Sequence, residues 1–312
     1  MFSIILGLIC GVGMPMQTSI NTKLGENLKS TYLSSATTFL VGAVGASIIM
    51  MLFMGGIHIP FDILIKEPLW IWTGGLCGTF IVILSITSLP KLGSIETMVM
   101  LVLGQIIIGL AVDNFGWFYQ EVIHLTLWRF LGSALVLGGT VMVSLANRNG
   151  EARTEKKTGG IWFYRFTALA AGVFCGLQIA VNGALGNVIG DSFTATLISM
   201  VFGFMGVVVV ICILYIFKGG RSAVFVEGPD IKGKWWMFTG GLFSLLIVGG
   251  NVVIARVIGT GLSVILNVVG QTFGGIVIDA VGFLGIEKKP VTMAKVAGVL
   301  IMIVGIVLVT FL

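Results

Sequence analysis

Charged residues are scarce in this sequence. Asp, Glu, Lys and Arg make up 10% of its 312 residues, whereas 57% are hydrophobic and the mean hydropathy is +1.09. Soluble domains carry about 25% charged residues, and disordered chains combine low hydrophobicity with high net charge. The composition therefore excludes both classes and indicates a membrane protein.

Residues suited to metal or enzyme chemistry are also few. Two histidines cannot supply an imidazole cluster for metal binding or proton relay. The four cysteines fall inside hydrophobic segments without metal-ligand spacing, which predicts packing thiols. The sequence contains no serine-hydrolase elbow, zinc-protease helix or phosphate-binding loop. We therefore expect no metal, no cofactor and no enzyme activity.

Hydrophobic runs dominate the chain. A helix needs about 20 apolar residues to cross about 30 Å of hydrocarbon, and ten such runs occur. Barrel strands would be shorter and would alternate apolar with polar residues, which these runs do not. The expected fold is an all-α polytopic membrane protein with ten transmembrane helices. The predicted spans are Ile4–Thr22, Leu33–Met54, Leu69–Leu89, Gly93–Val112, Thr126–Leu145, Thr167–Gly186, Phe193–Phe217, Trp235–Val257, Gly261–Ile278 and Val291–Leu312.

The sequence also repeats itself. An offset of 161 residues aligns PMQTSINTKLG (15–25) with GLQIAVNGALG (176–186), so that Gln17 matches Gln178 and Asn21 matches Asn182. An offset of 166 residues aligns VLGQIIIGLAVDNFGW (102–117) with VVGQTFGGIVIDAVGF (268–283), so that Gln105 matches Gln271. Such self-similarity predicts a duplicated architecture. The expected organisation is a five-helix repeat at 1–145, a basic linker at 146–162 and a second five-helix repeat at 163–312.

An odd number of spans in each repeat inverts the second repeat relative to the first. Lys and Arg are enriched in cytoplasmic loops and test this arrangement. Fifteen of them lie on the linker side: Lys23, Lys29, Lys91, Arg148, Arg153, Lys156, Lys157, Arg165, Lys218, Arg221, Lys232, Lys234, Lys288, Lys289 and Lys295. Three lie on the opposite side: Lys66, Arg129 and Arg256. The distribution predicts a cytoplasmic linker and both termini outside, in the plasma (inner) membrane, and it explains the net charge of +5 without a nucleic-acid partner.

Inverted repeats are the architecture of secondary transporters, because two similar halves can rock about one central site. Channels can share this symmetry. The paired first-span motifs, together with a Gly-Gln pair followed by Asp in the fourth span of each half, resemble the YdcZ-type branch of the drug/metabolite transporter superfamily in its fused form. The resemblance implies a ten-helix bundle, a carrier role and a cavity lined mainly by the first, third and fourth helices of each half. It does not imply a substrate.

The first-span amides are candidates for the substrate path. Gln17 and Asn21 are four residues apart and share a helix face, as do Gln178 and Asn182. An amide facing lipid would have no hydrogen-bond partner, so these faces should point into the bundle or a wet cavity. Two explanations stay open. The amides either bond between helices as packing contacts or line the transport path and bind substrate.

Further amides lie in other spans. Gln105 is 12 residues beyond Gly93, which places it about 18 Å deep at 1.5 Å per residue, and Gln271 should lie at a similar depth. We expect these two glutamines to face a central cavity and the Gln/Asn pairs to guard its two mouths. Asn251 and Asn267 replace Ser85 and Leu101 of the first half and make the second half more polar.

Ionisable residues within the spans are rare. Glu96 is the candidate for proton coupling, although it could instead cap a helix or pair with Lys91. Asp113 and Asp279 end the fourth span of each half and are interpreted as helix-end anchors. Arg129 and Lys295 begin the fifth spans and occupy the same place in their repeats. Two alternatives stay open for them, snorkelling of the side chain to the membrane interface or contact with an anionic substrate group.

The function expected from the sequence is secondary active export of a small metabolite or drug-like solute by alternating access. An amide-rich and acid-poor path favours a neutral or zwitterionic solute. The expected partners are that small molecule and the lipid bilayer, and a homodimer is allowed. The alternatives are a channel or facilitator and, less favoured, an intramembrane enzyme or a scaffold.

Overall fold

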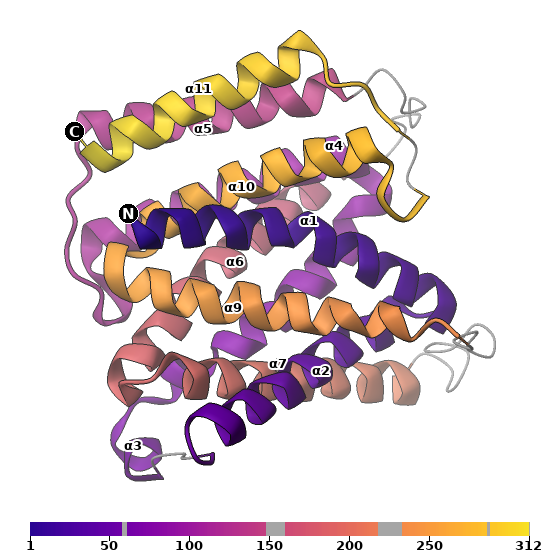
Figure 1. Cartoon of the computed structure of the whole chain (residues 1–312), viewed down its shortest axis with the longest axis vertical. Helices are drawn as coiled ribbons and strands as arrows, with labels where there is room; N and C mark the ends of the chain where they lie inside the picture. The colour runs from indigo at the N-terminus through magenta and orange to yellow at the C-terminus, as the bar shows by residue number, and fades with distance from the viewer. Residues whose placement is uncertain (58–60, 148–159, 218–232, 286–287, 312) are drawn as a thin grey trace.

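The protein is a bundle of long helices. A computed structural model describes residues 1–57, 61–147, 160–217, 233–285 and 288–311. In this part of the chain nine helices are long and apolar enough to cross a membrane, and no strand occurs (Figure 1). The nine are α1 (Phe2–Leu28), α2 (Thr31–Phe53), α4 (Gly74–Phe115), α5 (Leu127–Ala146), α6 (Ile161–Ile189), α7 (Ser192–Phe217), α9 (Thr239–Ile258), α10 (Thr260–Val281) and α11 (Met293–Phe311). Short helical turns flank them: α3 (Phe61–Lys66), η1 (Leu69–Trp72), η2 (Trp117–Tyr119), η4 (Trp235–Phe238) and η5 (Phe283–Gly285).

Helix α4 contains two of the predicted spans. Its 42 residues are interrupted at Gly93, whose φ of 77° and ψ of 170° are not helical. Residues 74 and 78 lie beside residues 182 and 178 of α6, whereas residues 101 and 108 lie beside residues 172 and 176. The chain therefore reverses its direction along α6 at Gly93. The spans predicted at Leu69–Leu89 and Gly93–Val112 are the two arms of this one element.

The second half has the same reversal as two separate helices. Gly259, at φ 79° and ψ 173°, ends α9 and begins α10. The positive φ of both residues is a conformation that glycine adopts without a Cβ penalty. Since 259 − 93 is 166, the two reversals occupy the same place in the two repeats.

The two halves of the chain interleave. The main helix pairs are α4 with α6, α1 with α9 and α10, α2 with α7, and α5 with α11. Each pair joins a helix of residues 1–145 to one of residues 163–312. The halves therefore share one core, in which buried apolar side chains from six helices meet: Val102, Val136, Ile179, Ala255, Val264 and Met302.

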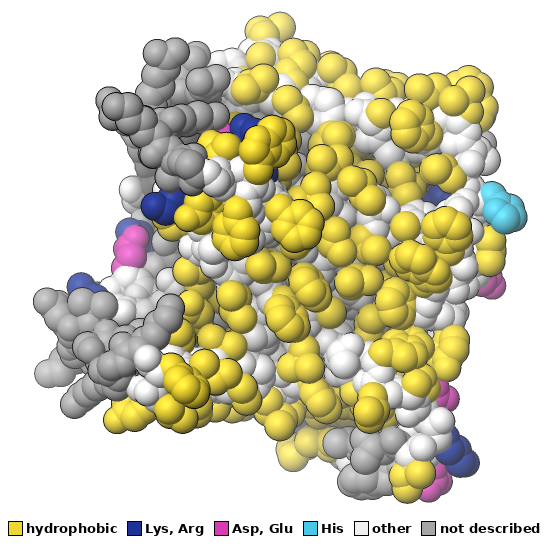
Figure 2. Space-filling view, turned by 180° about the vertical axis from the view of Figure 1, so that it is seen from behind, with side chains coloured by type: hydrophobic (Ala, Val, Ile, Leu, Met, Phe, Trp, Pro, Cys, Tyr) yellow, Lys and Arg dark blue, Asp and Glu magenta, His cyan; other side chains and the backbone are white. Residues whose placement is uncertain are grey.

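Both chain termini lie at one end of the bundle (Figure 1). The turn that joins α9 to α10 lies at this end, which we call the terminus side. The opposite end carries Gly93, the end of α5 and the start of α6, and we call it the linker side. Most of the expected basic linker, 148–159, lies outside the described residues. Hydrophobic side chains cover the broad face of the bundle between the two ends (Figure 2), as expected for a lipid-facing surface.

Candidate functional site

Glycines let the inner helices approach closely. A Cβ added at Gly172 of α6 would collide with the carbonyl oxygen of Leu101 in α4. A Cβ added at Gly11 of α1 would lie 2.5 Å from the carbonyl oxygen of Asn267 in α10. The two contacts correspond, since 172 − 11 is 161 and 267 − 101 is 166. Small residues at such crossings allow close backbone packing in membranes, so α1 and α6 hold equivalent places in the bundle.

The two first-span asparagines face matching glycines. A Cβ at Gly74 would collide with Oδ1 of Asn182, and one at Gly240 would collide with Oδ1 of Asn21. Asn21 is half-buried, and its Oδ1 accepts a hydrogen bond of 3.0 Å from the Thr38 hydroxyl. Asn182 is buried, and its Oδ1 has no hydrogen-bond partner in the described part of the chain. The first asparagine thus makes an interhelical packing contact, whereas the second has an unused acceptor.

The glutamines differ in burial. Gln105 is 1% exposed, and its Oε1 has no partner among the described residues. Its counterpart Gln271 is half-buried, as are Gln17 and Gln178. The Nε2 of Gln178 lies 3.1 Å from the place of a Cβ on Gly78, so this amide packs between α6 and the first arm of α4.

Two further amides bind each other. Nδ2 of Asn267 in α10 donates a 2.6 Å hydrogen bond to Oδ1 of Asn251 in α9. Both side chains are buried, and the Oδ1 of Asn267 has no partner among the described residues. Among the amides predicted for the substrate path, no other two are hydrogen-bonded to each other in the described ranges, and their spacing in the sequence did not predict this bond. Three of these amides, Gln105, Asn182 and Asn267, therefore have a buried oxygen without a donor in the described structure, as does Asn147 at the end of α5.

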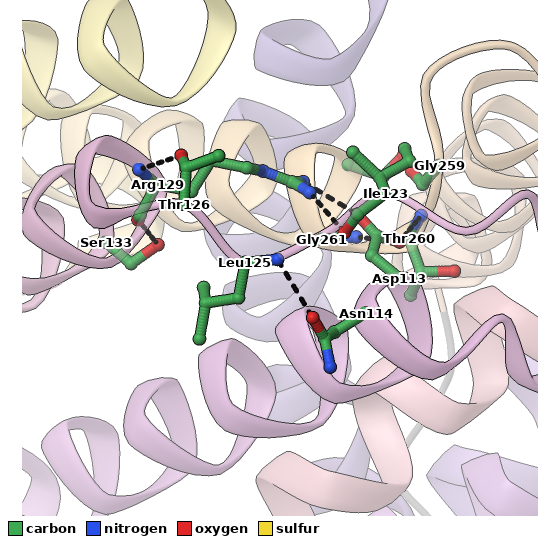
Figure 3. A network of polar contacts seen from close by, with 11 residues as sticks. Asp113, Asn114, Ile123, Leu125, Thr126, Arg129, Ser133, Gly259, Thr260 and Gly261 are labelled. Atoms are coloured by element: carbon green, nitrogen blue, oxygen red, sulfur yellow. Dashed lines mark hydrogen bonds and ion pairs between the residues drawn. The ribbon is translucent and has the colours of Figure 1, made fainter. Parts of the chain in front are cut away.

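A buried ion pair closes the terminus side. The Asp113 carboxylate accepts a hydrogen bond of 2.8 Å from Arg129 and bonds of 2.9 and 3.0 Å from the backbone amides of Thr260 and Gly261 (Figure 3). Arg129 also donates to the carbonyl of Ile123 at 2.9 Å. Asp113 is fully buried and Arg129 is 6% exposed. Asp113 therefore caps the N-terminus of α10, where a carboxylate is favoured, and we call these contacts the terminus-side lock.

The lock clarifies the interpretation of two residues. Asp113 anchors a helix end, but the helix belongs to the other half of the chain. The expectation that Arg129 snorkels to the interface is wrong, because its guanidinium is buried against Asp113. The sequence did contain a signal, since Asp113 and Arg129 are 16 residues apart and so are Asp279 and Lys295. A charge pair repeated at one spacing in both halves indicates a contact.

The second copy of this pair is arranged differently. Lys295 is 1% exposed, and its Nζ donates a 2.9 Å hydrogen bond to the carbonyl of Pro290. Snorkelling is therefore wrong for Lys295 as well. Asp279 is half-buried, and its carboxylate makes no hydrogen bond or ion pair with any described residue. The backbone is nevertheless equivalent, because Asp279 accepts from the amide of Lys289 at 2.9 Å as Asp113 does from that of Ile123 at 2.8 Å.

Glu96 has a partner that the sequence did not identify. Its Oε1 lies 2.6 Å from Nε of Arg165 in α6, and both side chains are partly exposed at the linker side. Arg165 also stacks over the ring of Trp162 at 4.7 Å. This pair joins the second arm of α4 to α6 and was not among the alternatives predicted from the sequence. The contact spans 69 residues of chain, so only the packed bundle brings the two side chains together.

These observations define the class of protein. An all-helical bundle with long apolar helices, a lipid-facing apolar surface and buried amides belongs among polytopic membrane proteins, in which interior polar groups mark functional sites. Comparison with protein families matches residues 2–142 and 163–308 to the family described as "Putative inner membrane exporter, YdcZ". The chain belongs to this family. The two matched segments cover its two halves, in agreement with a fused two-domain form of the YdcZ type.

Solved structures support the fold. One crystal structure aligns with 99% of this chain and 95% of its own, with a TM-score of 0.67 and 16% sequence identity. At this identity the likeness concerns the fold alone. The comparison with curated proteins found no match.

Proposed function

We propose that this protein is a secondary active transporter that exports a small neutral or zwitterionic solute by alternating access. The observation that carries the proposal is that three amides of the candidate path, Gln105, Asn182 and Asn267, each have a buried oxygen without a donor among the described residues. Buried polar groups in proteins are almost always hydrogen-bonded, and an unpaired group within a membrane is costly. Hydroxyl, ammonium or amide donors of a bound solute, or of the water that replaces it, would satisfy these acceptors.

Membership of an exporter family supports the direction of transport. Matching glycine contacts support two inverted repeats with ten spans, residues 1–145 and 163–312, joined by the linker 146–162. The pairs are Gly172 with Leu101 and Gly11 with Asn267, and Gly74 with Asn182 and Gly240 with Asn21. In both sets, the second contact is related to the first by the same two offsets, 161 and 166 residues. The two halves can therefore adopt each other's arrangement about a central site.

The amides have distinct proposed roles. Gln105, Asn251, Asn267 and Gln271 bind solute near the middle of the bundle. Gln17 and Asn21 act at the linker-side mouth, and Gln178 and Asn182 act at the terminus-side mouth. Glu96 serves proton coupling through its pair with Arg165, because release of the carboxylate from the guanidinium would allow it to take up a proton.

The charge distribution supports an orientation with the linker side in the cytoplasm and both termini outside. A single cysteine introduced into the linker of a variant that lacks the native cysteines should not be labelled by an impermeant maleimide applied to intact cells. Labelling before permeabilisation would reverse the proposed orientation.

The transport proposal is tested in liposomes containing the purified protein. A thermal-shift screen of neutral, zwitterionic and charged metabolites selects the solute, and counterflow of that labelled solute is then measured. Saturable counterflow without chemical change supports a carrier, whereas flux without saturation or counterflow indicates a channel. Conversion of the solute would indicate an enzyme, and an absence of any flux would leave a scaffold.

The central site is tested by substitution. Gln105→Ala and Gln271→Ala should each lower counterflow at least about tenfold, the effect of losing roughly 1.4 kcal/mol of hydrogen bonding. Gln120→Ala is the matched control, since Gln120 lies in the connection between α4 and α5 and donates only a 3.4 Å bond to the Ala180 carbonyl. Unchanged transport by well-expressed Gln105→Ala and Gln271→Ala would remove the central site from the proposal.

A further inference from the structure

The two ends of the bundle differ where the repeats predict equivalence. At the terminus side, a Cβ added at Gly259 would lie 3.1 Å from the Asp113 carboxylate. At the linker side, a Cβ added at Gly93 would meet no described atom within 4 Å. Both glycines have the same backbone conformation, φ 79° and ψ 173° against φ 77° and ψ 170°. The same reversal is therefore covered by a carboxylate at one end only.

Glycines on the inner helices show the same difference. A Cβ at Gly109 of α4 would lie 3.2 Å from Cα of Gly261 in α10, whereas one at the equivalent Gly275 would meet no described atom within 4 Å. A Cβ at Gly186 of α6 would lie 2.7 Å from Val252 in α9. At the equivalent Gly25 of α1, the three nearest atoms all belong to residues 30–34 and none to α4. The two copies of the contact between α4 and α10 therefore differ, since the halves are close at Gly109 of the terminus side whereas Gly275 of the linker side meets no described atom within 4 Å.

We propose that Asp279 and Lys295 form a linker-side lock that replaces the terminus-side lock when the protein changes conformation. In that state Asp279 accepts from the backbone amide of Ser94, as Asp113 accepts from that of Thr260. This inference rests on the two-state cycle of the proposed function and identifies the residues that hold its second state. Asp279 and Lys295 are thus positioning residues, distinct from the amides proposed to bind solute.

The present contacts of Asp279 and Lys295 fit this role. Lys295 is held by the carbonyl of Pro290 as Arg129 is held by that of Ile123. The ammonium is buried and lies beyond 4.0 Å from any described carboxylate. Asp279 lies near the end of α10, one turn beyond Gly275, and its backbone carbonyl accepts a hydrogen bond from the amide of Lys289. A buried cation without a carboxylate is costly, and closure of the linker side onto Asp279 would relieve that cost.

The positions of two spin-label pairs allow the two ends to be measured together. Labels at residues 115 and 257 report on the terminus side, and labels at residues 281 and 91 are their equivalents at the linker side, since 281 − 115 and 257 − 91 are both 166. All four side chains are exposed. The labels are placed in a background lacking the four native cysteines, and the distances between labels are measured by double electron–electron resonance in nanodiscs.

Opposite effects are expected from the two carboxylates. Asp113→Asn should shift the population roughly tenfold toward the state with a longer terminus-side and a shorter linker-side distance, because it removes a charge-assisted hydrogen bond. Adding Asp279→Asn should reverse this shift. If Asp113→Asn does not fold, Arg129→Lys weakens the same lock while keeping its charge. The proposal is overturned if Asp279→Asn leaves the distances unchanged in the shifted background.

Two controls separate locking from general destabilisation. Asp191 caps α7 through the backbone amides of Phe193 at 3.1 Å and Thr194 at 2.6 Å, within one half of the chain. Asp191→Asn should lower thermal stability without changing either distance distribution. Gly275→Leu should melt like the wild type, because its site is open, but should prevent linker-side closure and abolish the shortened linker-side distance. Normal closure in Gly275→Leu would contradict the predicted contact.

The distance measurements need no solute, so the lock and the transport function can fail separately. Reciprocal distance changes without counterflow would support the lock and refute transport. Counterflow by a protein whose spin-label distances do not change on Asp279→Asn would support transport and refute the lock.

Discussion

Replacing Gly172 by alanine should weaken the packing of α6 against α4. The added Cβ would collide with the Leu101 carbonyl oxygen and lie 3.0 Å from the backbone nitrogen of Gln105. Both atoms belong to a helix backbone, so no side chain can rotate away. Overpacking of this kind costs about 1–3 kcal/mol, against a gain of at most about 1 kcal/mol in helix propensity. We expect a net loss of about 1–2 kcal/mol in the free energy of unfolding.

The assay is unfolding in mixed micelles with a rising fraction of SDS, followed by far-ultraviolet circular dichroism. Gly138→Ala is the control, since a Cβ at this exposed glycine of α5 would meet no described atom within 4 Å. It should gain stability by up to about 1 kcal/mol or leave it unchanged. Gly11→Ala should match Gly172→Ala, because its Cβ would approach Asn267 and Gly270 of the other half at 2.5 and 2.7 Å.

The result that would refute this reasoning is a Gly172→Ala protein as stable as the Gly138→Ala control. The backbones of α4 and α6 would then not be in close contact at Leu101. If Gly172→Ala were destabilised and Gly11→Ala were not, the two crossings would not be equivalent.

Two further substitutions test individual contacts. Glu96→Gln should change the free energy of unfolding by less than about 1 kcal/mol, because the pair of Glu96 with Arg165 is partly exposed. If Glu96 couples transport to protons, the same substitution should make solute counterflow in liposomes insensitive to an imposed pH gradient. Counterflow that still responds to the gradient would exclude Glu96 as the proton-coupling residue. Asn251→Ala removes the acceptor of the Asn267 amide and should cost about 1–2 kcal/mol in SDS unfolding, so that an unchanged transition would show this bond to be dispensable.

The length and position of the helices were predictable because lipid imposes a long run of apolar residues on each span. The run Leu33–Met54 corresponds to α2 at Thr31–Phe53, and the run Gly261–Ile278 to α10 at Thr260–Val281. The predicted span Thr167–Gly186 was too short, since α6 covers Ile161–Ile189. Its first turn contains Trp162, Tyr164 and Arg165, whose polar groups do not end a helix although they lower the hydropathy of the run.

The polar contacts were harder to predict, because hydropathy says where a side chain lies along the membrane but not what it faces. The pair of Glu96 with Arg165 depends on the second arm of α4 packing against α6. The bond between Asn267 and Asn251 depends on the reversal at Gly259. The terminus-side lock does have a signal in the sequence, because Asp113 and Arg129 are separated by 16 residues and so are Asp279 and Lys295.

The two ends of the bundle differ in sequence at the lock itself, because Ile95 and Lys295 of the linker side take the places of Gly261 and Arg129 of the terminus side. Gly109 and Gly275 are both glycine, and Asp113 and Asp279 are both aspartate, yet among the described residues one member of each pair contacts the other half and its equivalent does not. Under the proposed lock, two halves that pivot about a packed centre close one end by opening the other, so that residues repeated in both halves make their contacts in turn.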